Sequence, residues 1–254
     1  MVSGQAAAYA VARARRLPRL RVGLHLVLVD GRPVLPQSEV PDLVRGTSFD
    51  PDMARAGVRF FFIPRVRRQL EAEIRAQFAA FRATDLPLDH VNAHKHMHLH
   101  PSVTRLVIEI GRDFGLEAVR IPYEPVPVLR RAYPAERYPT PPYQFWIKAL
   151  RRRLRRADLR ANDHVFGLAW SGGMVEERIL RLIPYLPEGI SEMYFHPATG
   201  SSPALVAAMP GYRHAEELAT LISPAVRHRI AEHGIRLVSY GDLTASPPPN
   251  RTLR

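Results

Sequence analysis

Five histidines gather in the twelve residues HVNAHKHMHLHP at positions 90–101, and all five fall on even positions. Histidine is the commonest side-chain metal ligand and the usual proton carrier near neutral pH. The cluster therefore indicates a metal site, a proton-transfer site or a solvated His-rich loop. An extended segment would direct His94, His96 and His98 to one face, where one or two of them would reach a common metal.

Two further histidines stand in stretches that predict strands. His25 interrupts the apolar run RVGLHLVLVDG at 21–31, and His196 lies in FHPATG. In parallel α/β folds, functional groups gather at the carboxyl ends of the strands. A hydrogen-bonded core residue is the more frequent role of a lone histidine on an apolar strand, so that alternative for His25 stays open. Two histidines and a carboxylate around one divalent ion are the usual layout of a metal-dependent hydrolase, but no carboxylate is evident beside His25 and His94.

The elements that must position these histidines alternate between strand and helix, which favours an α/β fold around a parallel sheet or barrel. The run at 21–31 predicts a buried strand, and the apolar spacing at 64–87 predicts an amphipathic helix. Further strands are predicted at 88–92, 117–122, 163–170, 191–197 and 235–243, and further helices at 102–116, 175–185 and 224–233.

The domain organisation that we expect is a single domain over 1–243. A Pro- and Tyr-rich irregular excursion at 123–146 and the basic helix after it form an insertion at about 123–160. The stretch at 244–254, rich in proline and polar residues, predicts a disordered tail.

Composition narrows the class of protein. Cysteine is absent, so any metal must be held by His, Asp or Glu. No apolar run approaches the roughly 20 residues that cross a bilayer. The N-terminal arginines follow the apolar part, the reverse of the order in an export signal. We therefore expect a cytoplasmic protein.

The net charge of +12 raises the question of nucleic acid. All but two of the 36 basic residues are arginine, and alanine and proline are abundant, which is typical of a GC-rich genome. No recognised binding motif accompanies the charge, so nucleic acid is not an expected partner.

The stretch YQFWIKALRRRLRRADLR at 143–160 predicts a helix with Trp146, Leu150, Leu154 and Ala157 on one face. One interpretation is a surface helix that packs this stripe on the core. The other is an interfacial helix at the inner face of an anionic membrane, where each basic residue adds about 1 kcal/mol.

Several motifs, in order, resemble the YdjC-like carbohydrate deacetylases. They are VGLHL with GRPVLP, DHVNAHKHMHLHP, EMYFHPATG and GIRLVSYGDL. VRFFFIPRVRRQLEAEIRAQFAAFRAT and the His cluster look most like the branch associated with hopanoid lipid biosynthesis. The resemblance runs over nearly the whole chain. It implies an irregular TIM-like (β/α) barrel and metal-dependent removal of N-acetyl groups from amino sugars, with an N-acetylglucosaminyl hopanoid as substrate.

The resemblance also implies roles for residues. His25 and His94 match the family's histidine ligands for one divalent metal ion, Mg²⁺ or Zn²⁺, and His96 and His98 match members that line the same substrate pocket. His196 is the candidate general acid. The family's aspartate before the cluster is Asn92 here, and its second cluster histidine is Lys95.

The family's opening Asp-Asp-Phe-Gly motif, which supplies a carboxylate ligand and the general base, has no counterpart in this sequence. The first residues resemble the family's second strand and helix, so the barrel is expected to be N-terminally incomplete as given. An in-frame upstream segment with that motif is therefore expected.

Alternative functions stay open at this point. They are a deacetylase of chitooligosaccharide-type sugars, a non-catalytic binding protein that lost the acidic motif, and a nucleic-acid binder. The expected partner is an amino-sugar-bearing lipid or oligosaccharide, and a homodimer is a further possibility.

Overall fold

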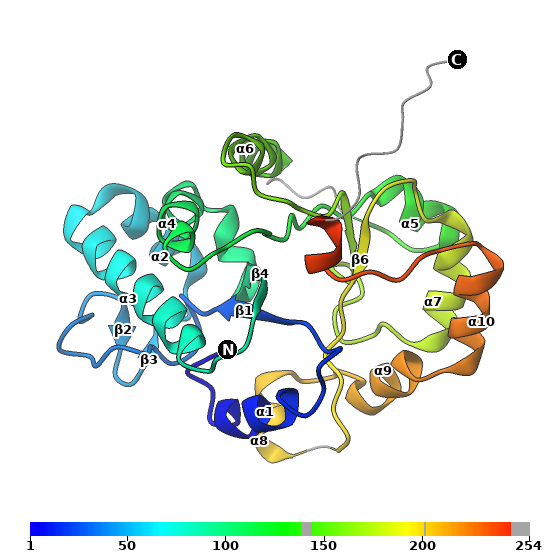
Figure 1. Cartoon of the computed structure of the whole chain (residues 1–254), viewed down its shortest axis with the longest axis horizontal. Helices are drawn as coiled ribbons and strands as arrows, with labels where there is room; N and C mark the ends of the chain where they lie inside the picture. The colour runs from blue at the N-terminus through cyan, green and yellow to red at the C-terminus, as the bar shows by residue number, and fades with distance from the viewer. Residues whose placement is uncertain (139–143, 201, 245–254) are drawn as a thin grey trace. The chain divides into compact units, whose positions relative to one another are not determined.

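The structure, a computed structural model, describes residues 1–138, 144–200 and 202–244 and divides into two compact units (Figure 1). Unit 1 consists of Met1–Arg120, Phe145–Ala161 and the chain from Val238 onward. Unit 2 consists of Ile121–Gln144 and Asn162–Leu237. The division separates His25 and the His cluster from His196.

Unit 1 is built on two parallel strands, β1 (Val22–Leu26) and β4 (Leu88–Ala93), which lie side by side in Figure 1. In their register His25 is opposite Asn92, and Leu26 is opposite Ala93. Apolar side chains of β1 are buried, with Leu24 and Leu26 at most 1% exposed. The predicted strand at 88–92 is confirmed, and the strand predicted at 21–31 is present but ends at Leu26.

Helix α3 (Pro64–Arg82) packs against β1 of this strand pair. The helices of unit 1 are α1 (Ala7–Ala14), α2 (Met53–Phe62), α3, α4 (Pro101–Arg112) and α6 (Gln144–Arg156). Proline occupies the first turn of α3, where no backbone N–H is needed. Leu70, Ile74 and Phe78 recur every four residues and are fully buried. The predicted helices at 64–87 and 102–116 are confirmed, and Gly115 follows α4 with a φ of +70°.

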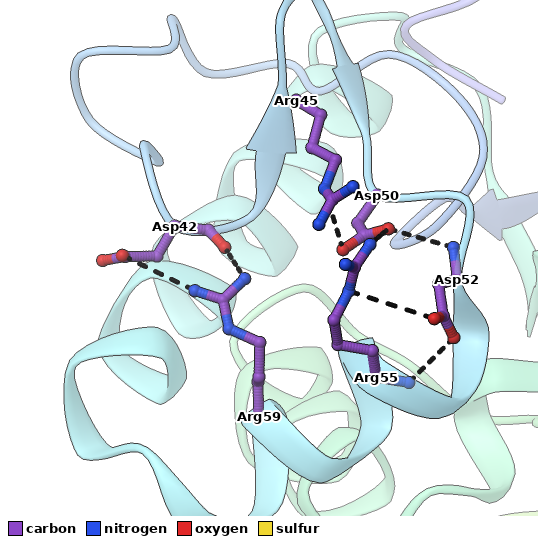
Figure 2. A network of polar contacts seen from close by, with 6 residues as sticks. All are labelled: Asp42, Arg45, Asp50, Asp52, Arg55 and Arg59. Carbon is purple, nitrogen blue, oxygen red and sulfur yellow. Dashed lines mark hydrogen bonds and ion pairs between the residues drawn. The ribbon is translucent and has the colours of Figure 1, made fainter.

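A small hairpin of β2 (Val44–Arg45) and β3 (Ser48–Phe49) precedes α2 and is held by ion pairs (Figure 2). Asp50, 4% exposed, accepts hydrogen bonds from the Arg55 side chain and the Asp52 amide and pairs with Arg45. Asp52 caps α2 by accepting from the Arg55 amide. The hydrogen bond from Arg55 is the main reason that the pKa of Asp50 lies below its usual value.

Unit 2 contains a second parallel pair, β5 (His164–Phe166) and β6 (Ser191–Met193). Its helical segments are α5 (Val126–Ala132), α7 (Glu176–Leu182), η2 (Ile183–Tyr185), α8 (Pro203–Ala208), α9 (His214–Leu221) and α10 (Pro224–Glu232). Phe166, Trp170 and Leu182 lie in one buried apolar cluster that joins β5 to α7. The predicted helices at 175–185 and 224–233 are confirmed, and the strands predicted at 163–170 and 191–197 are present as the shorter β5 and β6.

Three predictions about elements are wrong. Residues 235–243 form no strand, and this segment ends in the short helix η3 (Gly241–Thr244). Residues 117–122 make only single bridges, Val91 with Val119 and Ala118 with Arg160. The excursion at 123–146 is not wholly irregular, because α5 lies within it, while its residues 139–143 fall outside the described structure.

The fold is mixed α/β, as expected, but the expected barrel is not closed. The described strands form three two-stranded sheets. Single bridges at Val91 and Ala118 replace the continuous ladders that closure needs. The single domain over 1–243 and the tail stay predictions, and residues 245–254 lie outside the described range.

Helix α6 buries Leu150 and Leu154 of the predicted stripe, with Ile147 in place of Trp146. Ile147, Leu150 and Leu154 are at most 5% exposed, whereas Trp146 is 38% and Phe145 71% exposed. The two aromatic rings contact each other edge to face at the first turn of the helix. Within the described residues, no helix is long and apolar enough to cross a membrane.

The Asp50 network generates a stability prediction. Asp50→Ala leaves two arginines and one amide without their acceptor and should destabilise the protein by about 2 kcal/mol at neutral pH. The control Asp52→Ala removes a helix cap and a 4.0 Å ion pair with Arg55 and should cost about 1 kcal/mol. Because the folded state lowers the pKa of Asp50, its contribution is present above the ordinary carboxyl value. It is lost as the pH falls below about 4. Urea unfolding at neutral pH and at a pH below the ordinary carboxyl pKa measures this. Equal midpoints for Asp50→Ala and wild type at neutral pH would contradict it.

Candidate functional site

The candidate site of unit 1 is one face of the β1–β4 pair. Side chains alternate along a strand, so His90, Asn92 and His94 share one face of β4 and its continuation. His25 is opposite Asn92 in the parallel register and projects to the same side. The structure thus brings His25 and His94 together, with their ring centres 5.9 Å apart.

The chain turns sharply after His94 in the segment η1 (His94–Leu99). Lys95 and His96 have φ values of +49° and +55°, in the left-handed region that side chains other than glycine rarely adopt. Such strain persists only where surrounding contacts hold it, and it gathers at functional sites. The prediction of an extended segment with three histidines on one face is therefore wrong.

Contacts on both sides hold this turn. Lys95 pairs with Asp30, which follows β1. His98 is fully buried and donates from Nε2 to the carbonyl of Arg120. The hydroxyl of Thr104 in turn donates to the carbonyl of His98. His98 therefore anchors the cluster in this structure, while its expected place in a substrate pocket, like that of His96, stays a prediction.

His100 has a structural role at the start of α4. His100 is the N-cap residue of α4, and its side chain accepts a hydrogen bond from the amide of Ser102. Its ring lies edge to face against Phe60 and Phe61. It therefore provides a control position inside the cluster.

His25 is neutral and has a defined tautomer. Burial lowers its pKa to about 3, although the hydrogen bond with Asn92 acts in the opposite direction. Nδ1 of His25 lies 2.5 Å from Oδ1 of Asn92. An amide oxygen only accepts, so Nδ1 carries the hydrogen and Nε2 keeps its lone pair.

This arrangement fits a divalent metal ion with nitrogen ligands. Zinc–nitrogen bonds of about 2.0–2.1 Å in tetrahedral geometry place two imidazole ring centres about 5 Å apart, close to the observed spacing. A metal-binding histidine usually donates its other N–H to a fixed acceptor, as His25 does to Asn92. Among the described residues, no group of three His, Cys, Asp or Glu could hold a metal ion. His25 and His94 therefore offer two nitrogen donors, without a third such group beside them in the described residues.

Asn92 and the residues behind it have a role that was not expected from the sequence. Asn92 also contacts His90, and His90 contacts Asp89. Burial alone would raise the pKa of Asp89. The hydrogen bonds from His90 and the Gly241 amide outweigh it, so the pKa lies below its usual value. The alternation DHVNAH was the signal for this face, because it places His90, Asn92 and His94 in one phase.

His196 lies in unit 2, just after β6. Its backbone amide donates to Glu217, whose carboxylate is fully buried and also accepts from the Met174 amide. The ring of His196 contacts the rings of Tyr194 and Tyr212 edge to face, with centres 5.5 and 5.0 Å away. Glu217 was not expected from the sequence, since nothing in its local pattern distinguishes it from an exposed helix residue.

A second buried carboxylate shapes the segment after β5. Glu124 accepts from three consecutive backbone amides, those of Gly167, Leu168 and Ala169. Gly167 has a φ of +120°, and a Cβ there would lie 2.8 Å from the carbonyl oxygen of Tyr194. Burial raises the pKa of Glu124 against the opposing effect of these amides. Its role is to fix the backbone beside Tyr194.

Comparisons with known proteins define the family. A model of the YdjC-like protein family matches residues 1–232, so the chain belongs to this family. It is 29% identical to a carbohydrate deacetylase of Geobacillus stearothermophilus over 243 residues, covering 94% of this chain and 83% of the relative. It is 28% identical to a chitooligosaccharide deacetylase of Serratia marcescens over 252 residues, covering 96% and 86%.

A solved structure shares the fold. The structure, from Enterococcus faecalis V583 and named for cellobiose-phosphate cleavage, superposes with a TM-score of 0.70 at 22% identity. The match covers 96% of this chain and 85% of the other. At this identity the likeness concerns the fold alone.

Proposed function

We propose that the protein is a metal-dependent hydrolase that removes an N-acetyl group from an amino-sugar conjugate. The observation that carries the proposal is the pair His25 and His94. The ring of His25 is neutral, with its Nε2 lone pair available, and His94 lies beside it. Membership of the YdjC-like family and the relatives named carbohydrate and chitooligosaccharide deacetylases support this class of reaction.

His25 and His94 would hold one divalent ion. Two imidazole nitrogens favour Zn²⁺ over Mg²⁺, which prefers oxygen ligands. When bound, such an ion supplies the positive charge that acidifies water and polarises the acetyl carbonyl. The remaining ligands would be water or a carboxylate, and the described residues offer no such carboxylate beside the two histidines.

His196 is proposed as the general acid that protonates the leaving amine. Its backbone amide is held by Glu217 and its ring by two tyrosines, which restrict where the ring can donate a proton. His96, which is partly exposed, is proposed to line the substrate pocket, for which the sequence also predicted His98. His98, being fully buried, would act there by holding the turn.

The substrate proposed is an N-acetylglucosaminyl hopanoid, on the resemblance of 58–84 and 90–101 to the hopanoid branch. The alternative is a chitooligosaccharide-type sugar, which the name of the Serratia relative favours. Acetate release from the two kinds of substrate separates these, and release from neither favours a non-catalytic binding protein.

A lipid-linked substrate would make a membrane contact useful, and α6 is the proposed contact. The helix exposes Phe145 and Trp146 together with the arginines Arg152, Arg155 and Arg156. Aromatic side chains next to basic residues are typical of helices that lie at a lipid interface.

The metal proposal predicts the behaviour of three variants. His25→Ala and His94→Ala should each remove most Zn²⁺ binding, because each deletes one of two nitrogen ligands. His100→Ala should keep it, because His100 caps α4. Calorimetric titration with Zn²⁺ measures this, and stoichiometric binding that survives His94→Ala would contradict the assignment.

The general-acid proposal predicts that His196→Ala lowers turnover by about 10²-fold or more while metal content stays unchanged. Tyr194→Phe, which keeps the ring beside His196, should lower turnover far less. Acetate release and metal content are measured on the same preparations. Full turnover in His196→Ala would remove this residue from the mechanism.

The membrane proposal predicts salt-sensitive binding to anionic vesicles. The triple variant Arg152→Gln, Arg155→Gln and Arg156→Gln should weaken co-sedimentation, since each basic residue near the surface adds about 1 kcal/mol. Replacing Phe145 and Trp146 with Ser should weaken it at any salt concentration. Equal binding to neutral vesicles, or no effect of either variant, would leave α6 as part of the scaffold.

A further inference from the structure

Four polar side chains of unit 1 form one continuous chain of hydrogen bonds that ends at His25. Oδ2 of Asp89 lies 2.9 Å from Nδ1 of His90, and Nε2 of His90 lies 3.2 Å from Nδ2 of Asn92. Oδ1 of Asn92 lies 2.5 Å from Nδ1 of His25. The deacetylase proposal uses His25 alone, so the other three side chains have no role in it.

Asp89, at the end of the chain opposite His25, determines which group donates in every hydrogen bond. The carboxylate of Asp89 can only accept, so a neutral His90 donates from Nδ1 and accepts at Nε2. Asn92 therefore turns its amide nitrogen toward His90 and its oxygen toward His25. His25 must then donate from Nδ1, which leaves the lone pair on Nε2.

Packing holds this chain of groups in place. The ring of His90 stacks on Tyr240, with centres 4.4 Å apart, and a Cβ on Gly23 would come within 2.6 Å of it. Only a glycine at position 23 leaves room for the ring. Asn92 is buried, and the side chain of Asp89 is 4% exposed. The second oxygen of Asp89 accepts from the Gly241 amide.

We propose that Asp89, His90 and Asn92 are positioning residues that set the tautomer of His25, so that Nε2 faces a divalent cation. This role depends on the proposed function, because it requires a metal ion at His25. The hydrogen bonds that set the tautomer do not depend on the metal. Asp89 acts through His90 and Asn92, since its carboxylate accepts from His90 and from the Gly241 amide.

The arrangement makes Asp89→Asn a specific perturbation. The Gly241 amide still needs an acceptor, so the substituted side chain offers it the carbonyl oxygen and turns its NH₂ group toward Nδ1 of His90. His90 must then carry its hydrogen on Nε2, and the Asn92 amide flips to accept it. His25 meets an NH₂ group, accepts at Nδ1 and carries its hydrogen on Nε2, where a cation would bind.

A second substitution should rescue the first. In the double variant Asp89→Asn, Asn92→Asp, the new carboxylate accepts from both neighbours, so His25 again donates from Nδ1. A variant that merely damages the fold is not repaired by a second substitution in the same buried network. Asn92→Leu has no acceptor and should leave the His25 tautomer unset.

The experiment is long-range ¹H–¹⁵N NMR of histidine-labelled, metal-free protein, with His25→Gln used to assign the His25 signals. Wild type should show His25 protonated at Nδ1, Asp89→Asn at Nε2, and the double variant at Nδ1 again. Asp163→Asn, in unit 2, replaces a carboxylate that accepts from a backbone amide and should change nothing at His25. An unchanged His25 tautomer in Asp89→Asn would overturn the proposal.

Zn²⁺ titration of the same proteins supplies the second measurement. Affinity should fall about 10- to 100-fold in Asp89→Asn and Asn92→Leu and return in the double variant. If the tautomers follow the expected pattern but wild type binds no Zn²⁺, control of the His25 tautomer by Asp89 is supported and the proposed metal site is wrong. If His25 binds Zn²⁺ while its tautomer does not change in Asp89→Asn, the metal site is supported and the positioning role of Asp89 is wrong.

Discussion

The hydrogen bond between His25 and Asn92 is the interaction on which the candidate site depends. It exists because β1 and β4 run parallel in a register that places these two residues side by side. A shift of one residue would send the Asn92 side chain to the opposite face. The apolar neighbours Leu24, Leu26 and Val91, all buried, secure that register. The hydrophobic core and the polar face are thus two consequences of one strand pairing.

The turn after His94 completes the site at some cost in backbone strain. Two consecutive left-handed residues, Lys95 and His96, take the chain away from the strand direction, and burial of His98 holds the turn closed. An extended continuation would have carried the later histidines along the sheet edge. The observed turn leaves His94 beside His25. In unit 2 the same principle recurs, with the buried carboxylates of Glu124 and Glu217 fixing the backbone near Tyr194 and His196.

The sequence predicted the elements with strong periodicity and missed those that depend on distant contacts. The Val- and Leu-rich run around His25 and the four-residue spacing in α3 indicate their structures locally. The segment 235–243 has the pattern of a strand, yet it forms none and instead supplies Tyr240 and Gly241 to His90 and Asp89. No local pattern encodes such contacts. His25 and His94 could be paired from family motifs, whereas the role of Asn92 required the register, which composition and spacing do not contain.

The proposed mechanism depends above all on His25 and His94 binding one divalent ion through nitrogen. X-ray absorption at the zinc edge of the Zn²⁺-loaded protein tests this pairing most directly, because scattering from imidazole rings is distinctive. We predict two imidazole ligands with Zn–N distances of about 2.0–2.1 Å, falling to one in His94→Ala. A zinc ion with only oxygen ligands, or with an unchanged imidazole signal in that variant, would contradict the pairing.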